Sequence, residues 1–254
     1  RRKIIRTLMA HSTTPILEEF LESQVLLIDK PLDWTSFDVV NRLRIALCRK
    51  LKVKKLKVGH AGTLDPKATG LLIICTGKAT KRITEFQDQA KTYTGQIFLG
   101  ATRPSYDLET EVDAQYPTDH ISDEMIQYTT QSFVGIQQQM PPVYSAIKQD
   151  GKPVYKKAHK GEGDTVVMQP REVIIYDFNT SSDALPLVSF EVKCSKGTYI
   201  RSLAFDFGKK IGTGAYLASL RRTASGEFTV DDAWQLDDLI RYIDRYEPSV
   251  VVRT

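Results

Sequence analysis

Short apolar segments recur along most of the chain, and each has the length of a single strand or helix. Apolar residues that run together or alternate predict buried strands, and such patterns occupy residues 25–28, 71–76, 91–100, 172–178, 187–194 and 215–223. Apolar residues three or four positions apart predict helices, as at 16–23, 79–86, 123–133, 154–159, 200–211 and 236–246. Because the two patterns intermix without regular alternation, we expect an α+β fold with a mixed, mostly antiparallel sheet flanked by helices.

A further helix pattern begins at Thr35. The sequence Thr35-Ser36-Phe37-Asp38 is typical of a capping box, in which the hydroxyl accepts an unpaired backbone N–H and the carboxylate reaches back. The apolar spacing that follows predicts one buried face, made of Phe37, Val40, Leu43, Leu47 and Leu51. Residues 102–116, by contrast, are polar and acidic, and we expect a surface loop or hairpin there.

Residues 59–70 (GHAGTLDPKATG) predict a shaped loop rather than a regular element. Within it, Pro66 restricts the preceding Asp65 to extended backbone, so the turn would present one carboxylate in a fixed direction. Spacing alone leaves two interpretations open. Asp65 is either a catalytic carboxylate or the capping residue of a common Asp-Pro turn.

Arg201 is the second candidate for chemistry. It ends the run Lys196–Arg201, where a strand pattern gives way to a helix pattern. A guanidinium beside Asp65 would keep that carboxylate ionised, as a nucleophile requires. The alternative is an arginine that is structural or binds a phosphate.

Charge is unevenly distributed, although the net charge is only +4. The segment from Val39 to Leu64 has no acidic residue and contains Arg42, Arg44, Arg49, Lys50, Lys52, Lys54, Lys55 and Lys57. Acidic residues gather towards the other end, at Asp231, Asp232, Asp237, Asp238, Asp244 and Glu247. A basic segment next to a candidate active site favours a polyanionic substrate, and the alternative is a solvated helix face.

The sequence indicates no metal site and no cofactor. The three cysteines are widely spaced without a CxxC pair, and the four histidines lack ligand spacing, which fits a reducing cytoplasm. Neither a membrane helix, which needs ~20 apolar residues, nor a secretory signal is expected. Ser145–Lys148 fits the SxxK motif of serine enzymes, but the SDN and KTG motifs are lacking. Gly70–Lys78 lacks the spacing of an ATP-binding loop.

Taken together, blocks spread over the chain resemble the motifs of one family. In chain order they are Asp29-Lys30-Pro31 with Trp34-Thr35-Ser36, Gly59–Gly70, Lys91-Thr92-Tyr93 with Leu99-Gly100, Gln139–Lys148, Gly197–Leu203, and Leu220–Thr223 with Ser225-Gly226. The chain from Leu26 to Leu236 resembles the TruB family of tRNA pseudouridine-55 synthases. The resemblance implies a pseudouridine synthase-like sheet with a central active-site cleft.

The resemblance also implies roles for particular residues. Asp65 would attack the target uridine, Arg201 would pair with Asp65, and Tyr93 would stack on the flipped base and accept a proton. Tyr199 and Leu220 would line the pocket. The remaining substrate contacts would come from Lys30, which positions the loop, from His60, which stacks among T-loop bases, and from Arg42, Lys50, Lys52, Lys54, Lys55 and Lys57 along the RNA backbone.

A division of the chain follows from the resemblance. We expect an N-terminal extension and short helix at 1–24, a catalytic domain at 25–235, and a short acidic helix and tail at 236–254. We expect no C-terminal RNA-binding (PUA) domain, which many relatives carry. The enzyme would act in the cytoplasm as a monomer on the T-arm of tRNA, without a cofactor, a metal, a membrane or an obligatory protein partner.

Two positions depart from the family pattern, and two other functions stay open. Asp33 stands where the first motif usually has glycine, and His159 where arginine is common. One rival function is a tRNA-binding or RNA-folding protein without catalysis. The other is the branch of the family that depends on guide RNA and partner proteins.

Overall fold

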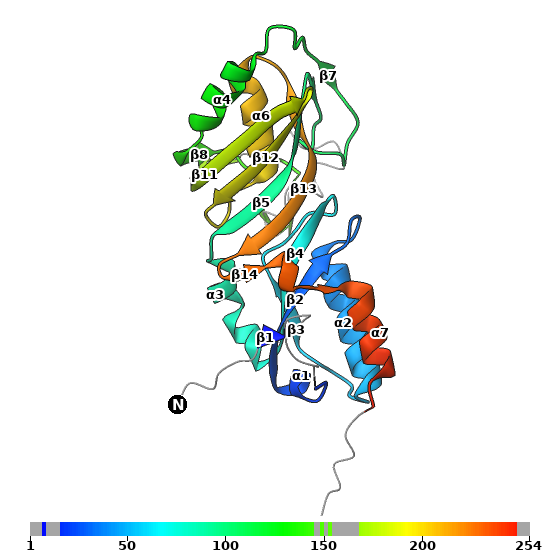
Figure 1. Ribbon diagram of the computed structural model, residues 1–254. Helices are drawn as coiled ribbons and strands as arrows, with labels where there is room; N and C mark the ends of the chain where they lie inside the picture. Colours follow the sequence, from blue (N-terminus) through cyan, green and yellow to red (C-terminus); the bar gives the residue numbers. More distant parts are fainter. Residues whose placement is uncertain (1–6, 9–15, 145–147, 150–151, 154–167, 248–254) are drawn as a thin grey trace, which may run out of the picture. The chain divides into compact units, whose positions relative to one another are not determined.

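The computed structural model describes residues 7–8, 16–144, 148–149, 152–153 and 168–247. Its contacts separate two compact units, one of residues 1–89 and 221–254 (the first unit) and one of residues 90–220 (the second unit). Figure 1 shows the elements of each unit by label and colour. Ser145, His159 and the predicted helix at 154–159 lie outside the described residues. The limits expected for the catalytic domain stay a prediction.

A small mixed sheet forms the centre of the first unit. Strands β2 (Ser23–Lys30) and β4 (Ala68–Gly77) pair antiparallel, and β3 (Val58–Ala61) pairs antiparallel with β4. The short strands β1 (Thr7–Leu8) and β15 (Trp234–Gln235) run parallel to β2. Because the two antiparallel pairings are longer than the two parallel ones, the sheet is mixed and mostly antiparallel, as predicted.

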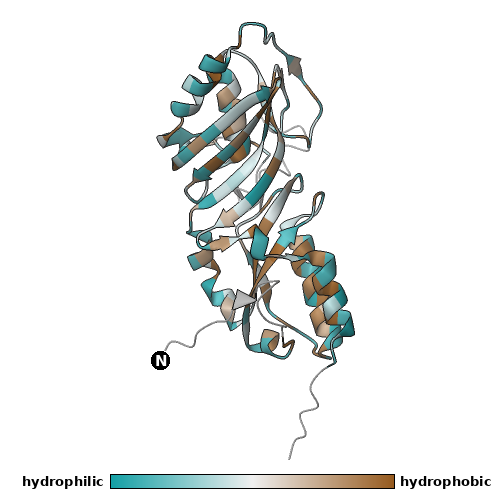
Figure 2. Cartoon of the chain, viewed as in Figure 1, coloured by the Kyte–Doolittle hydropathy of each residue, from teal (hydrophilic) through white to brown (hydrophobic). Residues whose placement is uncertain are grey.

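Both faces of the first unit's sheet are covered, which explains the continuous apolar runs in β2 and β4. Since neighbouring side chains of a strand point to opposite faces, Leu26 and Ile28 pack into one core cluster while Val25 and Leu27 pack into another. The helices α2 (Ser36–Lys50) and α7 (Leu236–Arg245) cover the first face side by side (Figure 1). Figure 2 shows their hydrophobic residues as brown bands beside hydrophilic ones.

Helix α2 confirms the predicted capping box but corrects its buried face. Thr35 caps the helix and Asp38 reaches back to the Thr35 N–H. Phe37, however, is 61% exposed, whereas Val39 is fully buried. With about 100° between consecutive residues, the buried face is centred on Ser36, Val40 and Leu43, and Phe37 lies beside it.

The remaining elements of the first unit are short. The predicted helix at 16–23 is limited to α1 (Glu19–Glu22). The predicted helix at 79–86 is divided into a 3-10 turn, η1 (Lys78–Arg82), and α3 (Ile83–Gln87). Between β13 and α7 lie β14 (Phe228–Thr229) and η3 (Val230–Asp232).

The second unit is built on antiparallel strands. In order, β5 (Lys91–Leu99), β12 (Leu187–Cys194), β11 (Arg171–Ala184) and β8 (Gly135–Gln139) are neighbours. Strand β13 (Ala215–Ser225) lies next to β5 and continues along the chain into the first unit at Arg221. Two short hairpins pair β6 (Ala101–Thr102) with β7 (Ala114–Gln115) and β9 (Lys148–Gln149) with β10 (Lys152–Pro153).

Helices α4 (Asp123–Gln131) and α6 (Ile200–Ile211) contact each other and complete the second unit. An aromatic cluster joins α6 to the strands, with the Phe178 ring 6.2 Å from both Phe190 and Phe207. The predicted limits of α6 are confirmed at both ends. No helix in the described residues is long and apolar enough to cross a membrane.

Candidate active site

The loop that carries Asp65 is fixed by the beginning of α2. The Ser36 hydroxyl, which is buried, accepts a hydrogen bond from the Leu64 N–H (2.9 Å) and donates one to the Leu64 carbonyl (3.0 Å). On the other side, the Ala68 N–H donates to the Asp65 carbonyl (3.0 Å) and closes the turn. The backbone is thus held on both sides of Asp65, whose own side chain is partly exposed.

Lys30 lies beneath this loop as a fully buried amine. Its Nζ donates to the carbonyls of Trp34 (2.6 Å) and Pro31 (2.9 Å) and lies 3.5 Å from the carbonyl of Pro66. Burial lowers the pKa of Lys30 to about 8, while the neighbouring carboxylates, Asp65 first among them, favour the charged form. This geometry fits the loop-positioning role expected for Lys30.

Asp33 has a backbone conformation that favours glycine. Its φ is 64°, in the left-handed region that favours glycine. The Asp33 N–H donates to the Pro66 carbonyl (2.9 Å), and Lys67 Nζ lies 2.7 Å from Asp33 Oδ1. This ion pair therefore links the first motif to the loop that carries Asp65.

The block at 220–223 supports the same loop from another strand. Arg222 is 2% exposed and donates to the carbonyls of Leu71 (2.7 Å) and Gly62 (3.1 Å). Gly70, at φ +100°, lies so close that a Cβ there would be 2.3 Å from the Arg222 carbonyl oxygen. The sequence places Arg222 in a motif without giving it a role. In the structure, Arg222 stabilises the loop through these two hydrogen bonds.

His60 lies on β3 in the same unit. Burial, reinforced by the nearby Arg222 guanidinium, lowers the pKa of His60 below its usual value. The imidazole is therefore neutral at pH 7. A neutral ring suits the stacking on bases that the sequence predicts for it.

In the second unit, Arg201 occupies the first turn of α6 and is 4% exposed. Its Nη1 donates to the Ser105 carbonyl (3.1 Å), and its Nε lies 3.7 Å from Oδ2 of Asp107, which is also buried. Asp107 in turn accepts from the Glu109 N–H (3.0 Å). The predicted pairing of Arg201 with Asp65 stays a prediction.

Asp107 is the residue that sequence reasoning missed. The segment 102–116 does form the predicted hairpin, but its tip is not a simple surface loop, because Ser105 and Asp107 are 0% and 3% exposed. Thr110 fixes this tip, since its hydroxyl accepts from the Ser105 N–H (3.0 Å). The one indication of such a partner in the sequence was Arg201 itself, because a buried guanidinium requires a carboxylate or carbonyl partner.

The Gln139 side chain fixes the backbone at the start of α6. Gln139 Oε1 accepts from the Tyr199 N–H (2.8 Å), and Gln139 Nε2 donates to the Tyr199 carbonyl (3.0 Å). One turn later, the Ser202 hydroxyl donates to the Met140 carbonyl (2.7 Å). Two blocks of the sequence are thereby joined, and the positions of Tyr199 and Arg201 are set by them.

The other two pocket candidates lie on neighbouring strands of the same unit. Tyr93, on β5, is 9% exposed and shares a buried face with Ile97 and Leu99. Leu220, on β13, is partly buried. The second unit thus contains Tyr93, Tyr199, Arg201 and Leu220, while the first contains Asp65, Lys30 and His60.

The basic segment divides into two parts. Lys50 donates to the Asp244 carbonyl (2.7 Å), and Arg49 pairs with the Asp244 carboxylate (2.6 Å), so this part binds helix α7. The lysines that follow are all exposed, namely Lys52, Lys54, Lys55 and Lys57. Within the described residues, no cluster of three or more His, Cys, Asp or Glu could hold a metal ion.

Solved structures share this fold. A chain of a Cbf5-Nop10-Gar1 complex matches with a TM-score of 0.66 and 30% identity over 90% of this chain. A second match, from an H/ACA RNP bound to a substrate RNA containing 2'-deoxyuridine, has a TM-score of 0.64 and 26% identity. This chain spans 56% of the length of each of those chains. The fold is that of the pseudouridine synthases.

The family follows from sequence comparison. Residues 49–200 match the TruB family pseudouridylate synthase N-terminal domain, and residues 201–250 match the tRNA pseudouridylate synthase B C-terminal domain. The tRNA pseudouridine synthase B of Flavobacterium johnsoniae is 54% identical over 85% of this chain and 94% of its own length. That of Parabacteroides distasonis is 50% identical over 89% and 96%. The chain belongs to the TruB family of pseudouridylate synthases, and its activity is that of an isomerase.

Proposed function

We propose that the protein converts uridine 55 in the TΨC loop of tRNA to pseudouridine, with Asp65 as the nucleophile. The observation that carries this proposal is the backbone clamp on both sides of Asp65, which presents a partly exposed carboxylate from a rigid turn. The two relatives reported above are both named tRNA pseudouridine synthase B, which supports tRNA as the substrate.

The reaction passes through a covalent intermediate on Asp65. Asp65 attacks the target nucleotide, at either the sugar or the base, and the bond between N1 of uracil and C1′ of the ribose breaks. The uracil turns within the site and its C5 bonds to C1′. The covalent bond to Asp65 also breaks, which regenerates the free carboxylate. Tyr93 accepts the proton that C5 loses, while N1 gains one. Because nothing is oxidised and nothing is released, the chemistry needs no redox cofactor. A nucleophile divides one difficult bond exchange into two easier ones.

Arg201 keeps Asp65 ionised, and Asp107 holds Arg201 in place. A buried guanidinium is costly unless it is paired, and Asp107 with the Ser105 carbonyl supplies that pairing. In this proposal Asp107 acts through Arg201, as a positioning residue.

The substrate must be opened before it reacts. Extruding a base from a folded RNA costs a few kcal/mol, and stacking on an aromatic ring such as Tyr93 returns about 1–3 kcal/mol. Tyr199 and Leu220 line the space for the flipped base, and His60 stacks among neighbouring bases. The exposed lysines at 52, 54, 55 and 57 bind RNA phosphates. Arg42 and Lys50 extend this contact, with Lys50 also held by α7.

We propose that the enzyme works alone, as a cytoplasmic monomer. The alternative that we weigh against this is the branch of the family that depends on guide RNA and partner proteins. One of the solved structures with the same fold is a multiprotein complex, the Cbf5-Nop10-Gar1 complex. The higher identity to enzymes named tRNA pseudouridine synthase B, 54% against 30%, favours the independent enzyme.

The test is the product formed by the purified protein on unmodified tRNA. We expect pseudouridine at position 55 alone, and the same conversion of an isolated T-arm hairpin, mapped by chemical labelling and mass spectrometry. A requirement for guide RNA or an added protein would favour the rival branch. Tight tRNA binding without product would favour a non-catalytic RNA-folding protein.

A further inference from the structure

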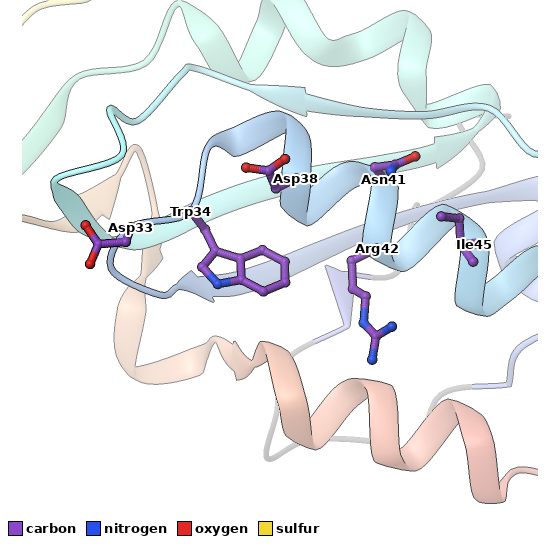
Figure 3. A pocket seen from close by; sticks show the side chains of 6 residues that line it. All are labelled: Asp33, Trp34, Asp38, Asn41, Arg42 and Ile45. Carbon is purple, nitrogen blue, oxygen red and sulfur yellow. The ribbon is translucent and has the colours of Figure 1, made fainter.

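A cavity of about 330 Å³ opens beside the catalytic loop, on the outer side of α2 (Figure 3). Its lining comes from the turn of the first motif and from one stripe of the helix, as Asp33, Trp34, Asp38, Asn41, Arg42 and Ile45. Figure 3 shows the Trp34 indole and the Arg42 guanidinium extending on the same side of α2. The volume lies at the lower end of the range for small-ligand sites, which begins at about 300 Å³.

The two carboxylates of this cavity have different partners. Asp33 pairs with Lys67 (2.7 Å). Asp38 accepts from the Thr35 hydroxyl (2.6 Å) and the Thr35 N–H (2.9 Å), which lowers the pKa of Asp38. Asp33 therefore repels an anion less than a free carboxylate would, while Asp38 stays ionised with its Oδ2 directed at Thr35.

Arg42 is the one cation among the residues that line the cavity. It is exposed, and among the described residues it makes no hydrogen bond or ion pair. Other cations of the same helix differ, because Arg44 binds Asn41 (2.7 Å) and Arg49 binds Asp244 (2.6 Å). The cavity thus offers one free guanidinium, which binds phosphate in a planar, bidentate geometry.

The other half of the cavity is apolar and aromatic. Trp34 is partly buried, with one part packed on the core under α2, and Ile45 is 53% exposed. An aromatic ring next to an arginine is the combination with which proteins bind unpaired nucleotides, the ring stacking on the base and the guanidinium pairing with the phosphate.

The cavity is also linked to the loop that carries Asp65. Asp33 lies at its edge, and the Asp33 N–H bonds to the carbonyl of Pro66, the residue after Asp65. An RNA that brings a uridine to Asp65 therefore has neighbouring nucleotides within reach of this side of α2.

We propose that this cavity binds one unpaired nucleotide of the RNA substrate, distinct from the target uridine, with its base on Trp34 and its phosphate on Arg42. The proposal rests on the proposed function, because it takes the substrate RNA as the occupant.

The two tryptophans of the chain, Trp34 and Trp234, make a direct test possible. In the Trp234→Phe variant, Trp34 is the one tryptophan left, and excitation at a wavelength that tyrosine does not absorb isolates its emission. We expect a T-arm hairpin to quench its emission on binding, and Trp34→Phe, which retains Trp234, to lose that quenching. Thermal unfolding of each variant checks that the fold is kept. Hairpins that each lack one unpaired base should identify a single position whose removal abolishes the quenching.

Arg42→Gln provides the second measurement. We expect an increase in KM for the hairpin of about tenfold, the effect of one lost phosphate contact, with kcat unchanged within about twofold. The matched control is Arg241→Gln, an exposed arginine on α7 whose partner is Asp238; its KM should not change.

Each outcome decides the inference separately from the proposed function. If the wild-type protein converts the hairpin but Trp34 emission does not respond, or no single base is required for the quenching, the nucleotide site is wrong and the activity stands. An Arg42→Gln variant with wild-type KM also contradicts it. If the wild-type protein forms no pseudouridine at all, the proposed function fails.

Discussion

The loop that carries Asp65 and the start of α6 that carries Arg201 hold their charged side chains by different means. In the loop, the backbone is clamped by Ser36 and the turn hydrogen bond while the Asp65 side chain keeps some exposure. At α6, the Arg201 side chain itself is buried against Asp107 and the Ser105 carbonyl. A nucleophile must reach its substrate, whereas a group that tunes it gains from a fixed, desolvated position.

This difference predicts the largest effect for the buried pair. Arg201→Gln and Asp107→Asn should each lower the free energy of unfolding by about 3–5 kcal/mol, because each leaves a buried charge alone. The double variant should be less destabilised than the sum of the two. Urea unfolding of all four proteins measures this coupling. The matched control is the exposed pair Arg49 and Asp244, with side chains 66% and 47% exposed, where coupling should stay below about 1 kcal/mol. Additive effects at Arg201 and Asp107 would mean that their contact contributes nothing.

The clamped loop should respond to backbone changes instead. Gly70→Ala should cost about 3 kcal/mol or more, because the new Cβ would lie 2.3 Å from the Arg222 carbonyl oxygen, adding a clash to the left-handed strain. Gly135→Ala separates the two causes, since Gly135 has a similar φ of +102° with nothing within 4 Å. It should cost only about 1–2 kcal/mol, the strain alone. Denaturant unfolding measures both values. If the two variants lose the same free energy of unfolding, the predicted clash at Gly70 is wrong.

A third effect depends on pH and concerns the amine beneath the loop. The folded-state pKa of Lys30 is about 8, below its ordinary value near 10.5, so the unfolded chain binds more protons between these pH values. Stability relative to Lys30→Met should therefore rise as the pH increases from 8 to 10.5, and stay constant between pH 6 and 7. Unfolding titrations of both proteins across this range measure the difference. A difference that is flat, or that falls with pH, would contradict the buried ammonium.

The same comparison explains what the sequence could predict. The Asp65 loop is marked by local signals, since its glycines and Pro66 lie close together in the chain. The capping box that begins at Thr35 is likewise a pattern of consecutive residues. Strand patterns and the limits of α6 are also local. The partner of Arg201 is not, because Asp107 comes from a hairpin whose polar composition resembles any surface loop.

Two further features could not be predicted from the sequence, because they depend on how α2 packs in the fold. Phe37 fits a helical period but lies beside the buried face, which the sheet and α7 select. The cavity at Trp34 depends on which side of α2 stays open, a property that the residue spacing does not contain. The roles of Lys30 and Asp33 could be suspected from the first motif, but their carbonyl and Lys67 partners required the structure.

The central claim is that the Asp65 carboxylate is the nucleophile, and Asp65→Asn measured against Asp237→Asn tests it most directly. Asp237 is an exposed carboxylate on α7, so its variant controls for the loss of one charge. In single-turnover assays on unmodified tRNA, we predict that Asp65→Asn binds tRNA within about threefold of wild type yet forms no pseudouridine, while Asp237→Asn retains full conversion. Substantial pseudouridine formation by Asp65→Asn would contradict the account.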